Sequence, residues 1–132
     1  MKMFLGETEE KLLQLVGKPV FRSYTNPEKL YYQNENFEGS FILYGGRIIK
    51  IEFSVRHRVS PSLYFLSALG IRQNDLLKKT AAEQVEYILK AYKNPRHTYI
   101  SNKLTVYSRG IRFIFEGDKI KRIEIFYPRR HP

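Results

Sequence analysis

The amino-acid sequence predicts an α+β fold. We expect two tandem repeats, each a helix followed by three or four antiparallel strands, forming one sheet with the helices packed on one face. Apolar and polar residues alternate on both sides of a Gly117-Asp118 turn, which is typical of a β-hairpin. The same pattern occurs 72 residues earlier, around Gly45-Gly46. A helical pattern of apolar residues precedes the strands of each half.

The length of the chain fits one such sheet. The 132 residues correspond to a single domain, since domains have roughly 100–200 residues. We place the first repeat at residues 4–55 and the second at 69–128, with a connector at 56–68 that contains a polar stretch and Pro61. A further short helix is predicted around residues 73–79, without a counterpart in the first repeat.

Each repeat begins with a predicted helix. In the first, Thr8 is a plausible N-cap, and apolar residues follow at the helical spacing of three and four: Leu12, Leu15 and Val16. In the second, Thr80 and Glu83 have the spacing of a capping box, and the apolar positions are Val85, Ile88, Leu89 and Tyr92. Pro19 and Pro95 stop the two helices and start the strands that follow.

Strand alternation assigns side chains to the two faces of the sheet. The face under the helices receives the core residues Phe41, Leu43, Ile49, Ile51, Phe53, Ile111, Phe113, Phe115, Ile123 and Ile125. The opposite face receives Ile42, Tyr44, Lys50, Glu52, Arg112, Ile114, Glu116, Arg122, Glu124 and Phe126. We place Tyr32, Tyr107 and Arg109 on that second face as well.

This order of elements resembles the β-lactamase-inhibitor-protein-like superfamily and the small lipoproteins of the outer-membrane assembly machinery. In the first half the resemblance rests on Gly17-Lys18-Pro19, Tyr32, Phe41 and Ile51. In the second half it rests on Pro95, Tyr107, Gly110-Ile111, Phe113, Phe115, Ile120, Ile123 and Ile125. The first half departs from the pattern, with Glu38-Gly39 where the second has Gly110-Ile111. The resemblance implies a tandem-repeat sheet whose exposed face binds proteins, without catalysis.

The residues show no pattern of a catalytic or metal-binding site. The chain has no cysteine, which excludes disulfides and cysteine-based metal sites. The three histidines, His57, His97 and His131, are scattered over a connector, a strand start and the tail. Gly45-Gly46 joins two strands and is therefore a hairpin turn rather than a phosphate loop. We predict no enzyme, no metal and no cofactor; the paired carboxylates Glu52 and Glu124 are a weak option, because each has basic neighbours.

The first of two functions that the sequence leaves open is protein binding by the outer sheet face. Tyrosine and arginine are enriched in strong interfaces because they supply large contact areas and planar hydrogen-bond donors. The predicted partner-binding residues are Tyr32, Ile42, Tyr44, Tyr107, Arg109, Arg112, Ile114, Arg122 and Phe126.

The second function is binding of nucleic acid or another anionic surface. The formal net charge is +10, and residues 67–132 carry fourteen Lys and Arg against six Asp and Glu. Arginines beside aromatic side chains on a sheet can bind single strands by stacking and phosphate contacts. The residues concerned are Arg109, Arg112, Lys119, Lys121, Arg122, Arg129 and Arg130.

The sequence leaves the location, the oligomeric state and the partner open. No apolar run approaches the roughly 20 residues of a transmembrane helix. The apolar stretch within residues 1–6 is shorter than a signal peptide needs. The protein is therefore expected in the cytoplasm, or in the cell envelope, periplasm or outside the cell if a leader has been removed.

Overall fold

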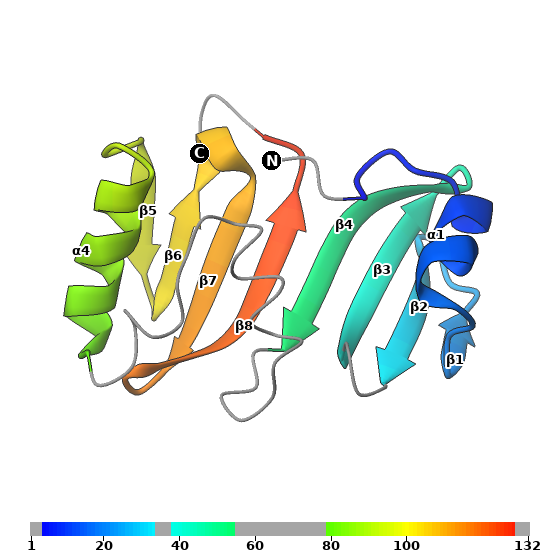
Figure 1. Ribbon diagram of the computed structural model, residues 1–132, viewed down its shortest axis with the longest axis horizontal. Coiled ribbons are helices and arrows are strands. Elements are labelled where there is room, and N and C mark those ends of the chain that lie inside the picture. The colour runs from blue at the N-terminus through cyan, green and yellow to red at the C-terminus, as the bar shows by residue number, and fades with distance from the viewer. Residues whose placement is uncertain (1–3, 34–37, 55–78, 129–132) are drawn as a thin grey trace.

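A computed structural model describes residues 4–33, 38–54 and 79–128. They form one eight-stranded antiparallel sheet with two α-helices, an α+β fold as predicted (Figure 1). The strand order is β1-β2-β3-β4-β8-β7-β6-β5, so each half of the chain supplies four adjacent strands. The strands are β1 Phe21–Ser23, β2 Glu28–Gln33, β3 Glu38–Tyr44, β4 Arg47–Ser54, β5 His97–Ile100, β6 Lys103–Val106, β7 Ile111–Glu116 and β8 Lys119–Phe126.

The two helices begin where their capping residues predict. In α1 (Glu9–Val16) the Thr8 hydroxyl accepts a hydrogen bond from the backbone N–H of Lys11. In α4 (Ala81–Ala91) the Thr80 and Glu83 side chains form the complete capping box. Such caps satisfy backbone N–H groups that have no partner inside the helix.

The apolar stripe of each helix was predicted with one error. Val85, Ile88 and Tyr92 are buried under α4, and Leu12 is fully buried under α1. Leu15 is 55% exposed, so its place in the predicted stripe of α1 is wrong. An eight-residue helix turns through little more than two turns, and only a narrow part of its surface meets the sheet.

The turns of the β3–β4 and β7–β8 hairpins contact the helix N-termini. The backbone N–H of Glu9, the first residue of α1, donates to the carbonyl oxygen of Gly46 at 3.3 Å. At the start of α4, the N–H of Ala81 donates to the Asp118 carboxylate at 2.9 Å, and the Gln84 amide donates to the Asp118 carbonyl oxygen. These bonds fix α1 at the β1–β2 end of the sheet and α4 at the β5 end (Figure 1).

The hydrophobic core lies between the helices and one face of the sheet. It contains nine of the ten predicted core residues, together with Leu30, Ile48, Leu104, Val106 and Ile120. Ile49 is the exception: it is only half-buried, and its predicted place in the core is wrong. The pairing register shifts there, because Ile42 pairs with Lys50 while Leu43 pairs with Ile48. This β-bulge leaves Ile49 unpaired and turns Ile48 into the core instead.

The two halves of the sheet meet along β4 and β8. Five residue pairs form this contact, from Lys50 with Phe126 to Ser54 with Arg122. At its centre Glu52 lies directly opposite Glu124, 72 residues later in the chain, the same interval that separates the two predicted hairpin turns. We call the β4–β8 contact the seam.

The predicted connector at 56–68 lies outside the described residues, and so does the predicted short helix at 73–79 except for its last residue, which is not helical. In the portions of the chain that the structure does describe, neither helix has the length and apolar character needed to cross a membrane.

Candidate protein-binding face

We call the side of the sheet opposite α1 and α4, the two helices among the described residues, the open face. Because paired residues on neighbouring strands share a face, Ile42, Lys50 and Phe126 lie on it together, as do Arg112 and Glu124. Six of the nine predicted partner-binding residues belong to this face by their register: Ile42, Tyr44, Arg112, Ile114, Arg122 and Phe126.

Exposure divides these six residues into three groups. Tyr44 and Arg122 are exposed, and Arg112 and Ile114 are half-buried. Ile42 and Phe126 are buried, at 5% and 8% exposure. The accessible part of the face is therefore more polar than the sequence pattern indicates.

The predicted position of Tyr32 on the open face is wrong. Its ring is 2% exposed and packs edge-on against Phe41 in the core, and its hydroxyl donates to the carbonyl oxygen of Gly17 at 2.8 Å. Burial raises the pKa of this hydroxyl. Tyr32 shares the face of Leu30, two residues earlier, which is fully buried.

Arg109 and Tyr107 lie in a 3-10 turn, Tyr107–Arg109, that interrupts the strand alternation. The Arg109 guanidinium carbon lies 5.2 Å from the ring centre of Tyr92, at the end of α4, so its predicted place on the open face is wrong. The half-buried Tyr107 reaches the β5 end of the open face, where its hydroxyl lies 3.2 Å from the Thr98 hydroxyl.

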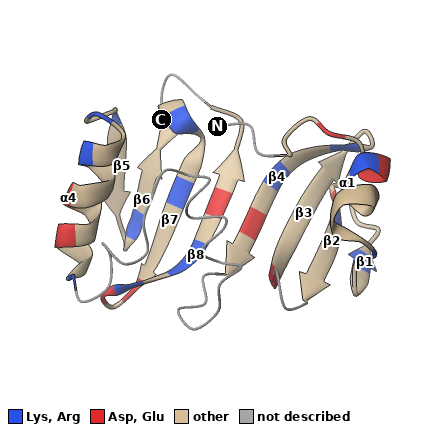
Figure 2. Cartoon of the chain, viewed as in Figure 1, with Lys and Arg blue, Asp and Glu red and all other residues tan. Residues whose placement is uncertain are grey.

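Five charged residues meet at the seam on the open face, and we call them the seam cluster: Lys50, Glu52, Arg112, Arg122 and Glu124. Figure 2 shows the acidic positions of β4 and β8 side by side at the middle of the sheet. Like charges placed opposite each other destabilise a sheet. Here Lys50 lies 3.3 Å from Glu52 and 3.7 Å from Glu124, and it offsets that repulsion.

Glu124 is the buried member of the seam cluster, with a 7% exposed side chain. Arg112 Nη1 donates to its Oε1 at 3.0 Å, and Arg122 Nη2 lies 3.9 Å from its Oε2. A buried carboxylate is tolerated when it is paired and hydrogen-bonded, as it is here.

Arg112 is held from three sides. Besides the bond to Glu124, its Nε donates to the hydroxyl of the buried Thr105 at 2.9 Å. The guanidinium carbon lies 5.7 Å from the ring centre of Phe126. Among the described residues, Nη2 of Arg112 makes no hydrogen bond, and the side chain is 31% exposed. One edge of a fixed guanidinium group is thus available to a ligand.

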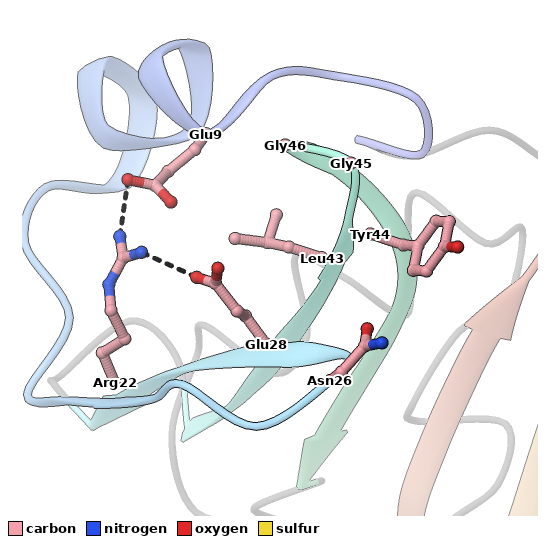
Figure 3. A pocket seen from close by; sticks show the side chains of 8 residues that line it. All are labelled: Glu9, Arg22, Asn26, Glu28, Leu43, Tyr44, Gly45 and Gly46. Atoms are coloured by element: carbon pink, nitrogen blue, oxygen red, sulfur yellow. Dashed lines mark hydrogen bonds and ion pairs between the residues drawn. The ribbon is translucent and has the colours of Figure 1, made fainter.

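A second polar site, which the sequence analysis missed, surrounds Arg22. Arg22 lies 2.5 Å from Glu9 and 2.9 Å from Glu28, and the bond with Glu9 raises the pKa of its guanidinium group. Beside it is a pocket of about 180 Å³, also lined by Asn26, Leu43, Tyr44, Gly45 and Gly46 (Figure 3). Both carboxylates are bound to Arg22, so the contacts join α1 to β1 and β2. The three residues come together only in the assembled sheet.

The basic residues of the second half are spread over several surfaces. Arg109 lies beside α4, while Arg112 and Arg122 surround Glu124 on the open face. Lys121, on β8, lies 3.0 Å from the exposed Glu116. Arg129 and Arg130 lie outside the described residues. Over residues 4–33, 38–54 and 79–128, no group of three His, Asp or Glu side chains is arranged to hold a metal ion.

Comparison of the chain with protein-family models, with curated proteins and with solved structures finds no match. The resemblance to the β-lactamase-inhibitor-protein-like superfamily therefore stays a prediction from the sequence.

Proposed function

We propose that this protein is a non-enzymatic binding domain that receives a protein partner on the open face of its sheet. The observation that carries the proposal is the fixed position of Arg112 at the seam. Its guanidinium group is bound by Glu124 and Thr105 and stacked on Phe126, and it remains partly exposed. The Arg112 side chain is already ordered before a partner binds. Contact with a partner therefore costs this side chain little additional conformational entropy.

The surroundings of Arg112 support a protein partner. Ile114, two residues along β7, adds partly accessible apolar surface beside it, and Tyr44 adds an exposed aromatic side chain at the end of β3 on the same face. Interfaces combine such apolar and aromatic contacts with a few well-placed arginines, and the arginines and aromatics often contribute most of the binding energy.

Site-specific photo-crosslinking tests the proposal. A photoreactive amino acid replaces Tyr44 or Ile114 on the open face, and Leu15 on the helix side serves as the matched exposed control. In an extract of the source cells, we expect the same protein to be crosslinked from both open-face positions and not from Leu15. Arg112→Ala should abolish this crosslink. Equal crosslinking from Leu15, or crosslinking unchanged by Arg112→Ala, would contradict the proposal.

We also propose that the two halves of the chain are copies of one helix-and-hairpin unit. In support, the two helix caps, Thr8 and Thr80, lie 72 residues apart, and so do the two bulged residues, Ile49 and Lys121. Replacing residues 44–47 by the sequence of residues 116–119 tests the equivalence. We expect the exchanged chain to fold with a free energy of unfolding within about 1 kcal/mol of the parent, since exposed turn substitutions have small effects; failure to fold would contradict it.

A further inference from the structure

We infer that the seam cluster is a receptor for one carboxylate group, which the partner presents as an aspartate or glutamate side chain on a protruding loop. This inference rests on the proposed function, because it assigns the chemistry of the partner that the open face receives.

The charges of the seam cluster are unbalanced. Among residues 4–33, 38–54 and 79–128, its three cations, Lys50, Arg112 and Arg122, are ion-paired with two carboxylates, Glu52 and Glu124. The cluster therefore carries one net positive charge at the middle of the face. A single further carboxylate neutralises it.

Some hydrogen-bond donors of the seam cluster also lack an acceptor among the described residues. Within the described residues, Nη2 of Arg112 has no acceptor, and Arg122 makes no hydrogen bond at all, only the 3.9 Å ion pair with Glu124. The Arg122 side chain is 48% exposed. Guanidinium groups bind carboxylates through pairs of parallel N–H···O bonds, and such bonds are among the strongest in proteins.

The cluster also favours a single carboxylate over a polyanion. Arg112 and Arg122 are both bound to Glu124, and Glu52 lies directly opposite it. A nucleic acid carries closely spaced phosphates, and some of them would lie near these two glutamates. A protein loop brings one charge and can add apolar side chains against Ile114, which neighbours Arg122 in the register.

A displayed library of random twelve-residue peptides is the probe, selected on the immobilised full chain. We expect peptides that bind the open face to share an acidic residue. Replacing that residue by its amide should weaken binding at least tenfold, and so should Arg112→Lys, which keeps the charge but loses the planar donor pair. Arg122→Gln, at a more exposed position, is the second variant in case Arg112→Lys alters folding, which thermal unfolding will show. Lys90→Gln on α4 removes one charge from the helix side and should leave binding unchanged.

The outcomes separate this inference from the proposed function. Peptides that lose affinity with Tyr44→Ala or Ile114→Ala, yet bind equally well when the acid is replaced by the amide, would overturn the carboxylate receptor and leave the open face as a binding surface. Recovery of no peptide that depends on the open face would overturn both. A third outcome is that the selection yields no acidic peptides, while oligo-dT binds in a salt-sensitive manner and Arg112→Lys weakens that binding. This outcome would also overturn both and support the nucleic-acid alternative.

Discussion

Gly110 is a position where the fold leaves no room for a side chain. It precedes β7 with φ +64°, in the left-handed region, and a Cβ there would lie 2.1 Å from the carbonyl oxygen of Phe126. Real Cβ atoms essentially never approach another heavy atom to under 3.0 Å. Because the obstacle is backbone at the end of β8, it cannot rotate away as a flexible side chain can.

The expected loss of stability for Gly110→Ala has two parts. An L-residue in the left-handed region costs about 1–2 kcal/mol. Relieving the collision must separate the end of β8 from Gly110, which breaks the 2.8 Å hydrogen bond from the Phe126 N–H to the Gly110 carbonyl oxygen. Such a bond contributes about 1 kcal/mol. We expect a total of about 2–3 kcal/mol, a large share of the roughly 5–15 kcal/mol that stabilises a domain.

Gly117→Ala is the matched control. Gly117 also has a positive φ, +60°, but no atom lies within 4 Å of its Cβ position. This variant should lose only the contribution of the backbone conformation, about 1–2 kcal/mol. Urea unfolding followed by circular dichroism measures both free energies. If Gly110→Ala loses no more stability than Gly117→Ala, the close approach of β8 to Gly110 is refuted.

Three other predictions concern the core and the pH dependence of stability. Phe53→Ala, at a residue 2% exposed, should lower the free energy of unfolding by about 3–5 kcal/mol in urea; a loss below 1 kcal/mol would contradict its burial. Hydrogen bonds from the Thr80 backbone and side chain lower the pKa of Glu83. Stability should therefore fall as the pH drops from about 5 through that lowered pKa, and Glu83→Gln should flatten this part of the acid titration; an unchanged slope would contradict the capping box. Burial raises the pKa of Tyr92 above its usual value near 10. The unfolded chain ionises first, so stability should fall as the pH rises above about 10, and less steeply in Tyr92→Phe; equal slopes would show that Tyr92 is not buried.

Local sequence signals predicted the parts of the fold that depend on a few neighbouring residues. The caps at Thr8 and Thr80 and the turn at Gly117 are such signals, because a short hydrogen-bond pattern or a positive φ decides them. The bulge at Ile49 was missed, since alternation assumes that every residue is paired and cannot show where one is skipped.

The candidate site was predicted in part. Alternation placed Arg112, Arg122, Glu52 and Glu124 on the correct face. That Glu124 would be buried and hold both arginines depends on side-chain packing between β7 and β8, which no spacing in the sequence encodes. Arg109 was misplaced because a 3-10 turn replaces strand geometry there.

The seam has a consequence for the order of folding. Its strands are separated by about 70 residues of chain, whereas β3–β4 and β7–β8 are hairpins with two-residue turns. Contacts between distant residues form slowly, because closing a long loop costs entropy before any contact is gained. The hairpins should therefore form first, leaving β4 for a time as an unpaired strand edge. Charges on such an edge oppose pairing with other chains, and Lys50 and Glu52 place two of them on β4. Lys50 and Glu52 thus belong to the proposed binding surface of the folded sheet, and during folding they would reduce aggregation through the unpaired edge of β4.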